Sequence, residues 1–157
     1  MTEVVRIIDP NYVTTEAVYF YTPQYYAFDS FSAFAVELWD KVFPTAEHAY
    51  QWKKFSFSAS SVAEEIFNAR SARDTKVIAD RHRDDVSPEW NDLKVSFMEE
   101  ILRAKLGQHE KVKSLLQETK SLEIIENSPT DIFWGIGNGE GKNELGKLWM
   151  KLRSELE

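Results

Sequence analysis

Hydrophobic and polar residues alternate in the early part of the chain, which is rich in β-branched and aromatic side chains. This pattern predicts strands at residues 4–8, 18–21 and 34–39. The sequence ELWDKVF, at the end of this region, predicts a hairpin with its turn near Asp40 and Lys41.

From Thr45 onward, apolar residues recur at three- and four-residue steps, which predicts helices. Residues that commonly cap helices precede four of these segments. We therefore expect helices to begin at Thr45, Ser61, Ser71 and Ser87, the last with Pro88 at its first helical position.

The longest helical pattern covers residues 90–105 and ends at Gly107. It is followed by a shorter helix around residues 112–116, a strand at 122–126 and a final amphipathic helix at 145–156. Early strands followed by helices predict an α+β fold that is mostly helical, with a small antiparallel sheet from the N-terminal part.

The length and composition fit one folded domain. The chain has 157 residues, 43% of them hydrophobic, and it contains no internal repeat or low-complexity linker. We therefore expect a single compact domain over residues 1–157. Because the chain has no cysteine, disulfides and thiolate chemistry are excluded.

The charge and the N-terminal sequence narrow the range of partners. A net charge of −7 argues against sequence-independent binding to nucleic acid, which depends on clustered Lys and Arg. One basic cluster, at residues 70–83, could meet a phosphate or could be a solvated helix face. The N-terminal sequence MTEVVRIIDPNY lacks the apolar core of a signal peptide, and no segment approaches the roughly 18 apolar residues of a spanning helix. We expect a cytoplasmic protein without a membrane partner.

The segment FPTAEHAYQWKKF carries the first candidate site. On a helix from Thr45 to about Phe55, Glu47, Gln51 and Lys54 fall on one narrow face at i, i+4 and i+7. This face could bind a substrate, or Glu47 could simply stabilise the first turn through the helix dipole.

A metal site is not expected in this segment. A zinc-binding HExxH helix needs two histidines four residues apart, and His48 has no second histidine nearby. His82 and His109 are isolated as well. The sequence therefore predicts no metal.

The glycine-rich end of the chain carries the second candidate site. Five of the six glycines lie in DIFWGIGNGEGKNELGKLWMKLR, which matches neither a P-loop nor a G-x-G-x-x-G pattern. Just before the glycines, Asp131 and Trp134 could offer an acceptor and a stacking face to a flat heterocycle. Alternatively, Trp134 only anchors the loop to the core. Asn143 is a possible N-cap of the last helix.

Taken together, these segments resemble the NADAR family, the YbiA-like N-glycosidases. The resemblance starts at YYAFDSFSAF, includes FPTAEHAYQWKKF and EWNDLKVSFMEEILRAKL, and closes with DIFWGIGNGEGKNELGKLWMKLR. The order of these motifs along most of the chain makes it specific. One departure is Ala33, which stands where the family has Asn in Phe-Ser-Asn-Phe, so any substrate contact of that Asn is not carried over.

The resemblance implies an enzyme that hydrolyses the C1′–N bond between ribose and an amino-substituted heterocycle. In YbiA-like members the substrates are phosphoribosylamino-pyrimidine intermediates of riboflavin biosynthesis, and the products are ribose 5-phosphate and an amino-pyrimidine. Other members remove ADP-ribose from guanine bases, which is the first alternative function. The second alternative is a non-catalytic module that binds ADP-ribose or a nucleotide. No cofactor is implied.

The resemblance also suggests roles for individual residues. Glu47 is the candidate carboxylate near C1′, and Asp131 is a second carboxylate that binds ribose hydroxyls or shares proton transfer. Lys54 either forms an imine with C1′ or pairs with Glu47 or a phosphate, and Lys54→Arg would separate these roles because it keeps the charge without imine chemistry. The remaining substrate-binding candidates are Trp90 and Trp134 for base stacking, Arg81 and Lys142 for phosphate, and Gln51 and Asn143.

Overall fold

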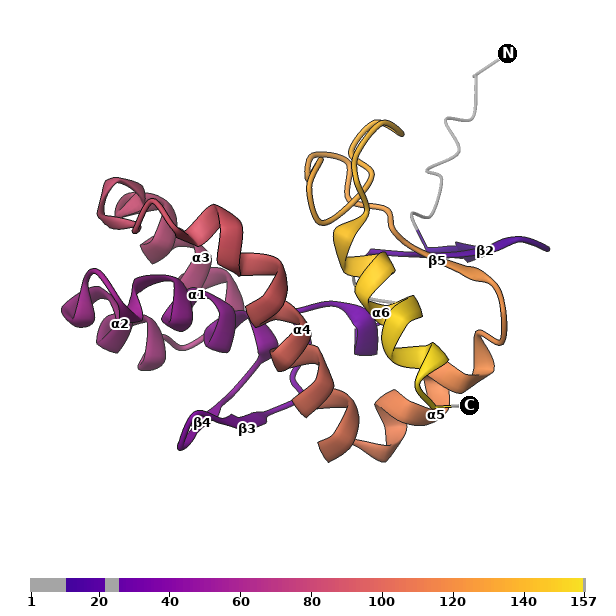
Figure 1. Cartoon of the computed structure of the whole chain (residues 1–157), viewed down its shortest axis with the longest axis horizontal. Helices are drawn as coiled ribbons and strands as arrows, with labels where there is room; N and C mark the ends of the chain where they lie inside the picture. Colours follow the sequence, from indigo (N-terminus) through magenta and orange to yellow (C-terminus); the bar gives the residue numbers. More distant parts are fainter. Residues whose placement is uncertain (1–10, 22–25, 157) are drawn as a thin grey trace, which may run out of the picture.

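The computed structural model describes residues 11–21 and 26–156 (Figure 1). Six α-helices and two small sheets make up this described part, so the predicted α+β class is confirmed. The strand expected at residues 4–8 lies outside the described residues.

The larger sheet joins strands that are far apart in the sequence. It contains β1 (Tyr12–Val13), β2 (Ala17–Phe20) and β5 (Glu123–Glu126), in the order β1-β2-β5. The β1–β2 pair is antiparallel, whereas β5 runs parallel to β2, with Phe20 opposite Glu126. A parallel pair needs a long crossover, and here the crossover contains the helices α1 to α5.

The second sheet is the predicted hairpin of β3 (Val36–Leu38) and β4 (Lys41–Phe43). The turn residues are Trp39 and Asp40, which both have positive φ angles, of 53° and 58°. Two successive residues with positive φ are typical of the tight turns that match the twist of a hairpin.

The helices match the predicted order. They are α1 (Ala46–Ser56), α2 (Ser60–Phe67), α3 (Ala72–Arg81), α4 (Trp90–Gln108), α5 (Glu110–Glu118) and α6 (Glu144–Ser154), with short 3₁₀ turns η1 (Tyr26–Phe28) and η2 (Arg83–Asp85). No helix in the described ranges is both long and apolar enough to cross a membrane.

Two of the predicted caps are confirmed. The Thr45 hydroxyl accepts a hydrogen bond of 3.1 Å from the backbone N–H of His48, and the Ser71 hydroxyl accepts one of 3.1 Å from that of Asp74. These bonds satisfy N–H groups that the first turn of a helix leaves unpaired. The caps fix where α1 and α3 begin.

The other two predicted starts are wrong. Helix α2 begins at Ser60, one residue before Ser61, and no side chain caps it. Helix α4 begins at Trp90 rather than after Ser87, whose hydroxyl bonds the carboxylate of Glu89 instead. A side-chain partner two residues away has replaced the cap in this case.

The core lies where α1, α4, α6 and the larger sheet meet. In Figure 1, helices α1, α2 and α3 cluster on one side of α4, while α6 and β5 lie on the other. The core side chains with no exposed surface include Phe20, Phe28, Phe43, Ile101, Leu102, Ile124 and Trp149. This core holds the end of β5 and the face of α1 in fixed positions, and the candidate site is built from both.

Candidate active site

A cavity of about 630 Å³ contains most of the polar groups that the sequence singles out. Its walls come from α1, α3, the segment 29–31, the end of β5 and the loop 128–134. Segments from both ends of the chain therefore meet around it, as expected for a ligand site between packed elements.

The predicted face of α1 lines this cavity. Glu47, Gln51 and Lys54 all belong to its wall, and the first two are buried. The Gln51 amide donates a hydrogen bond of 2.8 Å from Nε2 to Oε1 of Glu47. Gln51 Oε1 is itself buried and has no hydrogen-bond partner among the described residues. An amide oxygen in that state is suited to accept a hydrogen bond from a bound molecule.

The surroundings shift the protonation of the two ionisable groups on this face. Burial raises the pKa of Glu47 to about 7, against the opposing effects of the Gln51 hydrogen bond and the nearby charge of Lys76. Burial also lowers the pKa of Lys54, followed in effect by the like charge of Lys76. The helix face therefore offers a carboxyl that titrates near neutrality and an amine that loses its proton more easily than usual.

Asp131 and Trp134 form another part of the wall. Oδ1 of Asp131 accepts backbone hydrogen bonds from Phe133 at 3.0 Å and from Trp134 at 2.8 Å, which shapes the turn. The Trp134 ring stands edge-on to the ring of Tyr50, with centroids 5.7 Å apart. Both aromatic residues line the cavity and give it an apolar surface suited to a heterocycle.

Asn143 supports the site from outside the cavity. It precedes α6 with a φ of 53°, and its side chain does not cap that helix. Its Oδ1 instead accepts a 2.9 Å hydrogen bond from the backbone N–H of Glu126, and its Nδ2 donates one of 2.9 Å to the carbonyl of Ile124. The amide thus ties the glycine-rich loop to β5.

Three other predicted residues lie away from the cavity wall. Trp90 is buried behind Tyr50, with ring centroids 5.3 Å apart. Arg81 is exposed, 3.9 Å from Glu65 on the outer surface of α2 and α3. Lys142 is exposed beside Phe133. None of the three is in the position of a wall residue.

Two basic wall residues were not predicted individually. Arg73 and Lys76 line the cavity from the exposed face of α3. They belong to the basic cluster noted in the sequence, but Arg81 lies about 140° around the helix from Lys76, since each residue turns the helix by about 100°. Arg81 lies only about 80° from Arg73 by the same spacing, so the pattern distinguishes it from Lys76 but not from Arg73.

Glu126 is a further wall residue that the sequence analysis missed. It is the last residue of β5, and burial raises its pKa to about 8, with further upward effects from Asp131, Asp29 and Glu47. A polar residue at the carboxyl end of a parallel strand often faces a ligand site. The sequence alone does not show that β5 pairs in parallel with β2, so it could not indicate Glu126 in this way.

The histidine of the FPTAEHAYQWKKF segment has a structural role. The His48 ring is buried, with Nδ1 2.8 Å from Oγ1 of Thr45 and Nε2 3.0 Å from the carbonyl oxygen of Ala69. Within residues 11–21 and 26–156, no three His, Asp or Glu side chains are grouped so that they could hold a metal ion. Ala33, at the position where the sequence departs from the family pattern, is exposed and outside the cavity wall.

Several known proteins resemble this chain in sequence and in fold. The sequence pattern of the NADAR domain matches residues 19–157. The N-glycosidase YbiA of Escherichia coli (strain K12) is 36% identical over 133 residues, covering 82% of this chain and 80% of that protein. The chloroplastic riboflavin biosynthesis protein PYRR of Zea mays is 34% identical over 145 residues, covering 83% of this chain and 23% of that larger protein. The NMR structure of E. coli YbiA superposes with a TM-score of 0.78 at 33% identity, covering 96% of this chain and 89% of the YbiA chain.

Proposed function

This chain belongs to the NADAR family, and we propose that it is an N-glycosidase that hydrolyses the C1′–N bond of a phosphoribosylamino-pyrimidine of riboflavin biosynthesis. The products would be ribose 5-phosphate and an amino-pyrimidine. One observation carries the proposal: the cavity brings Glu47, Lys54 and Asp131 together with the aromatic surface of Tyr50 and Trp134.

Glu47 is suited to act at C1′ of the ribose. Cleavage of the C1′–N bond develops positive charge at C1′, which a nearby carboxylate stabilises, and the same carboxylate can take a proton from the attacking water. The pKa of Glu47, raised to about 7 by burial, allows it to accept and release a proton near neutral pH. Gln51 holds one carboxyl oxygen and so orients the group.

Lys54 retains two possible roles, and its surroundings favour the covalent one. Among the described residues, no carboxylate oxygen lies within 4.0 Å of Lys54 Nζ, the distance limit for an ion pair. Burial also lowers the pKa of Lys54. A free amine can attack C1′ of a ring-opened ribosylamine, expel the amino-pyrimidine and leave an imine that water hydrolyses. The alternative is that Lys54 stays charged and holds a phosphate.

Arg73 and Lys76 are better placed for the phosphate than Arg81 and Lys142. Both line the cavity and are exposed, so they can meet a phosphate from solvent without first being desolvated. Lys76 already forms a surface ion pair with Asp80, with Nζ 3.3 Å from Oδ1. An incoming phosphate would compete with that exposed ion pair, which contributes little.

The test is a competition assay followed by mass spectrometry. Wild type, Glu47→Gln and the control Glu118→Gln, an exposed acid at the end of α5, each receive a phosphoribosylamino-pyrimidine and an ADP-ribosylated guanine oligonucleotide. We expect ribose 5-phosphate from wild type and control, and a rate lower by about 10²–10⁴-fold in Glu47→Gln. Release of ADP-ribose alone would move the function to removal of a base modification, and release from neither substrate would contradict the proposed enzyme.

A further inference from the structure

The cavity holds a second carboxyl whose position is fixed by the fold, that of Glu126. Its backbone lies opposite Phe20 in the parallel β2–β5 pair. Its N–H donates to Oδ1 of Asn143 at 2.9 Å, and its carbonyl oxygen accepts from the N–H of Ile136 at 3.0 Å. The side chain therefore projects into the cavity wall from a rigid strand end, as functional groups that need accurate placement do.

The carboxyl of Glu126 is packed closely against the glycine-rich loop. A methyl group at Gly135 would lie 2.9 Å from Oε2 and 2.9 Å from the carbonyl oxygen of Glu126, so the absence of a side chain there makes room for the carboxyl. Oε2 is buried and has no hydrogen-bond partner among the described residues. An ionised oxygen in that state is unfavourable, whereas a protonated carboxyl avoids the buried charge.

The charges around Glu126 act in the same direction. The other titratable groups of the wall are Tyr21 after β2, Asp29 from the segment after η1, Glu47, Tyr50 and Lys54 from α1, Arg73 and Lys76 from α3, and Asp131 from the loop after β5. The three acids raise the pKa of Glu126 after burial, which is the largest cause. No Lys, Arg or His nitrogen of the described residues lies within 4.0 Å of its carboxyl to counteract them. At neutral pH, Glu126 therefore carries a proton.

We propose that Glu126 is the acid that protonates the leaving nitrogen of the heterocycle, while Glu47 acts at the ribose; this rests on the N-glycosidase function proposed above. The Glu126 proton passes to the exocyclic nitrogen as the C1′–N bond breaks and its electron pair stays with that nitrogen. Water, attacking C1′ either directly or as its imine with Lys54, forms the new bond to C1′ and gives a proton to Glu47. After product release, solvent returns a proton from Glu47 to Glu126, and the cycle is balanced.

This assignment gives the two buried carboxyls different tasks. An N-glycosidase must deliver a proton to a poor leaving group and remove one from the nucleophile, which calls for one protonated and one ionised acid. The activity, measured as kcat/KM, should rise as Glu47 ionises near pH 7 and fall as Glu126 ionises near pH 8. Because the two carboxyls interact, the two apparent pKa values of this pH profile belong to the pair rather than to either residue alone.

The test compares Glu126→Gln with Glu123→Gln, an exposed acid on the same strand. Steady-state kinetics with the phosphoribosylamino-pyrimidine are measured across a pH series. For Glu126→Gln we expect kcat to fall by about 10²–10⁴-fold with KM changed by less than about threefold, and the alkaline limb to disappear. Glu123→Gln should match wild type. A Glu126→Gln variant that keeps its rate, or keeps the alkaline limb, overturns the proposal.

A measurement on the unaltered protein covers the case in which the variant folds poorly. Carboxyl ¹³C NMR of the wild type should show Glu126 titrating above pH 7, and titration below about pH 5, near the ordinary value, would overturn its role as acid. Wild type that cleaves the substrate while Glu126→Gln does so equally well removes only this inference. Wild type that cleaves nothing removes the proposed function with it.

Discussion

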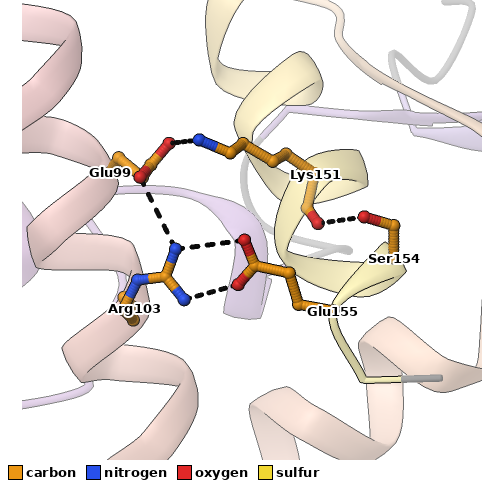
Figure 2. A network of polar contacts seen from close by, with 5 residues as sticks. All are labelled: Glu99, Arg103, Lys151, Ser154 and Glu155. Carbon is orange, nitrogen blue, oxygen red and sulfur yellow. Dashed lines mark hydrogen bonds and ion pairs between the residues drawn. The ribbon is translucent and has the colours of Figure 1, made fainter.

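The carboxylates between α4 and α6 and those of the cavity are the same residue types in opposite situations. On the outer surface, Glu99 meets Lys151 at 2.5 Å and Arg103 at 3.5 Å, and Arg103 also bonds Glu155 at 2.5 Å (Figure 2). Each acid there faces a cation, and the side chains are between 25% and 55% exposed. The hydrogen bond from Arg103 lowers the pKa of Glu155. Glu155 therefore stays ionised at neutral pH.

In the cavity the acids are buried among one another. Burial raises the pKa values of Glu47 and Glu126 to about 7 and about 8. Among the described residues, Gln51 is the only side chain that donates a hydrogen bond to either carboxyl. Burying these acids with no ion-pair partner among the described residues costs electrostatic stability. Groups whose pKa values burial shifts toward neutrality are suited to proton transfer, so the contrast marks the cavity as the functional site.

The largest test of this contrast is the pH dependence of stability. The folded-state pKa of Glu126 is near 8, against an ordinary 4.5. The protonated Glu126 carboxyl therefore contributes its full share to the free energy of unfolding below about pH 4.5, and this contribution is lost as pH rises through 8. The free energy of unfolding of Glu126→Gln, which cannot ionise, should therefore gain about 2–4 kcal/mol relative to wild type between pH 5 and pH 9. Denaturant titrations across that range measure it.

The surface acid Glu155 is the matched control for this experiment. The Arg103 hydrogen bond lowers the pKa of Glu155. The free energy of unfolding of Glu155→Gln, relative to wild type, should therefore change with pH only at low pH and with the opposite sign, and should stay constant between pH 5 and pH 9. An unfolding free energy for Glu126→Gln that runs parallel to wild type across the range would show that Glu126 is ionised in the folded protein.

A smaller effect is expected from filling the space beside Glu126. Gly135→Ala places a methyl 2.9 Å from two oxygens of Glu126 and 3.1 Å from the carbonyl oxygen of Asp131, two of these three atoms being backbone. We expect a loss of about 1–3 kcal/mol in the free energy of unfolding from this overpacking, together with reduced turnover. Thermal and denaturant unfolding measure the first.

Gly107 in α4 provides the comparison for this substitution. No atom lies within 4 Å of a methyl at that position, and a helical glycine costs about 0.5–1 kcal/mol relative to alanine, so Gly107→Ala should be neutral or stabilising. Equal losses for the two variants would show that crowding of the Glu126 carboxyl is not the cause.

The difference between local and long-range determinants explains which features the sequence could predict. The face formed by Glu47, Gln51 and Lys54 follows from helical spacing within eight residues, and the hairpin follows from a local alternation and turn. Both were predicted. Glu126 is brought to α1 by the pairing of β5 with β2, across more than a hundred residues, and no local pattern encodes that pairing.

Single aromatic and basic residues show the same limit. Trp90 and Trp134 were equal candidates for stacking, but tertiary packing puts Tyr50 between Trp90 and the cavity while Trp134 reaches the wall. Arg81 was predicted from the basic cluster and Arg73 was not, although the packing of α3 against α1 turns Arg73 to the cavity. The sequence predicted the helices and the chemistry, and their relative placement required the fold.

The smallest effect should come from the surface network itself. Lys151→Met removes the partner of Glu99, yet the pair is exposed and Arg103 still lies 3.5 Å from Glu99. Exposed ion pairs contribute little, so the midpoint of thermal unfolding should change by about 1 °C or less, and the difference should vanish at about 1 M salt. Differential scanning calorimetry at low and high salt measures both. A drop of about 5 °C that survives high salt would mean that these charges hold α6 against α4, and the surface acids would then, like those of the cavity, depend on their place in the fold.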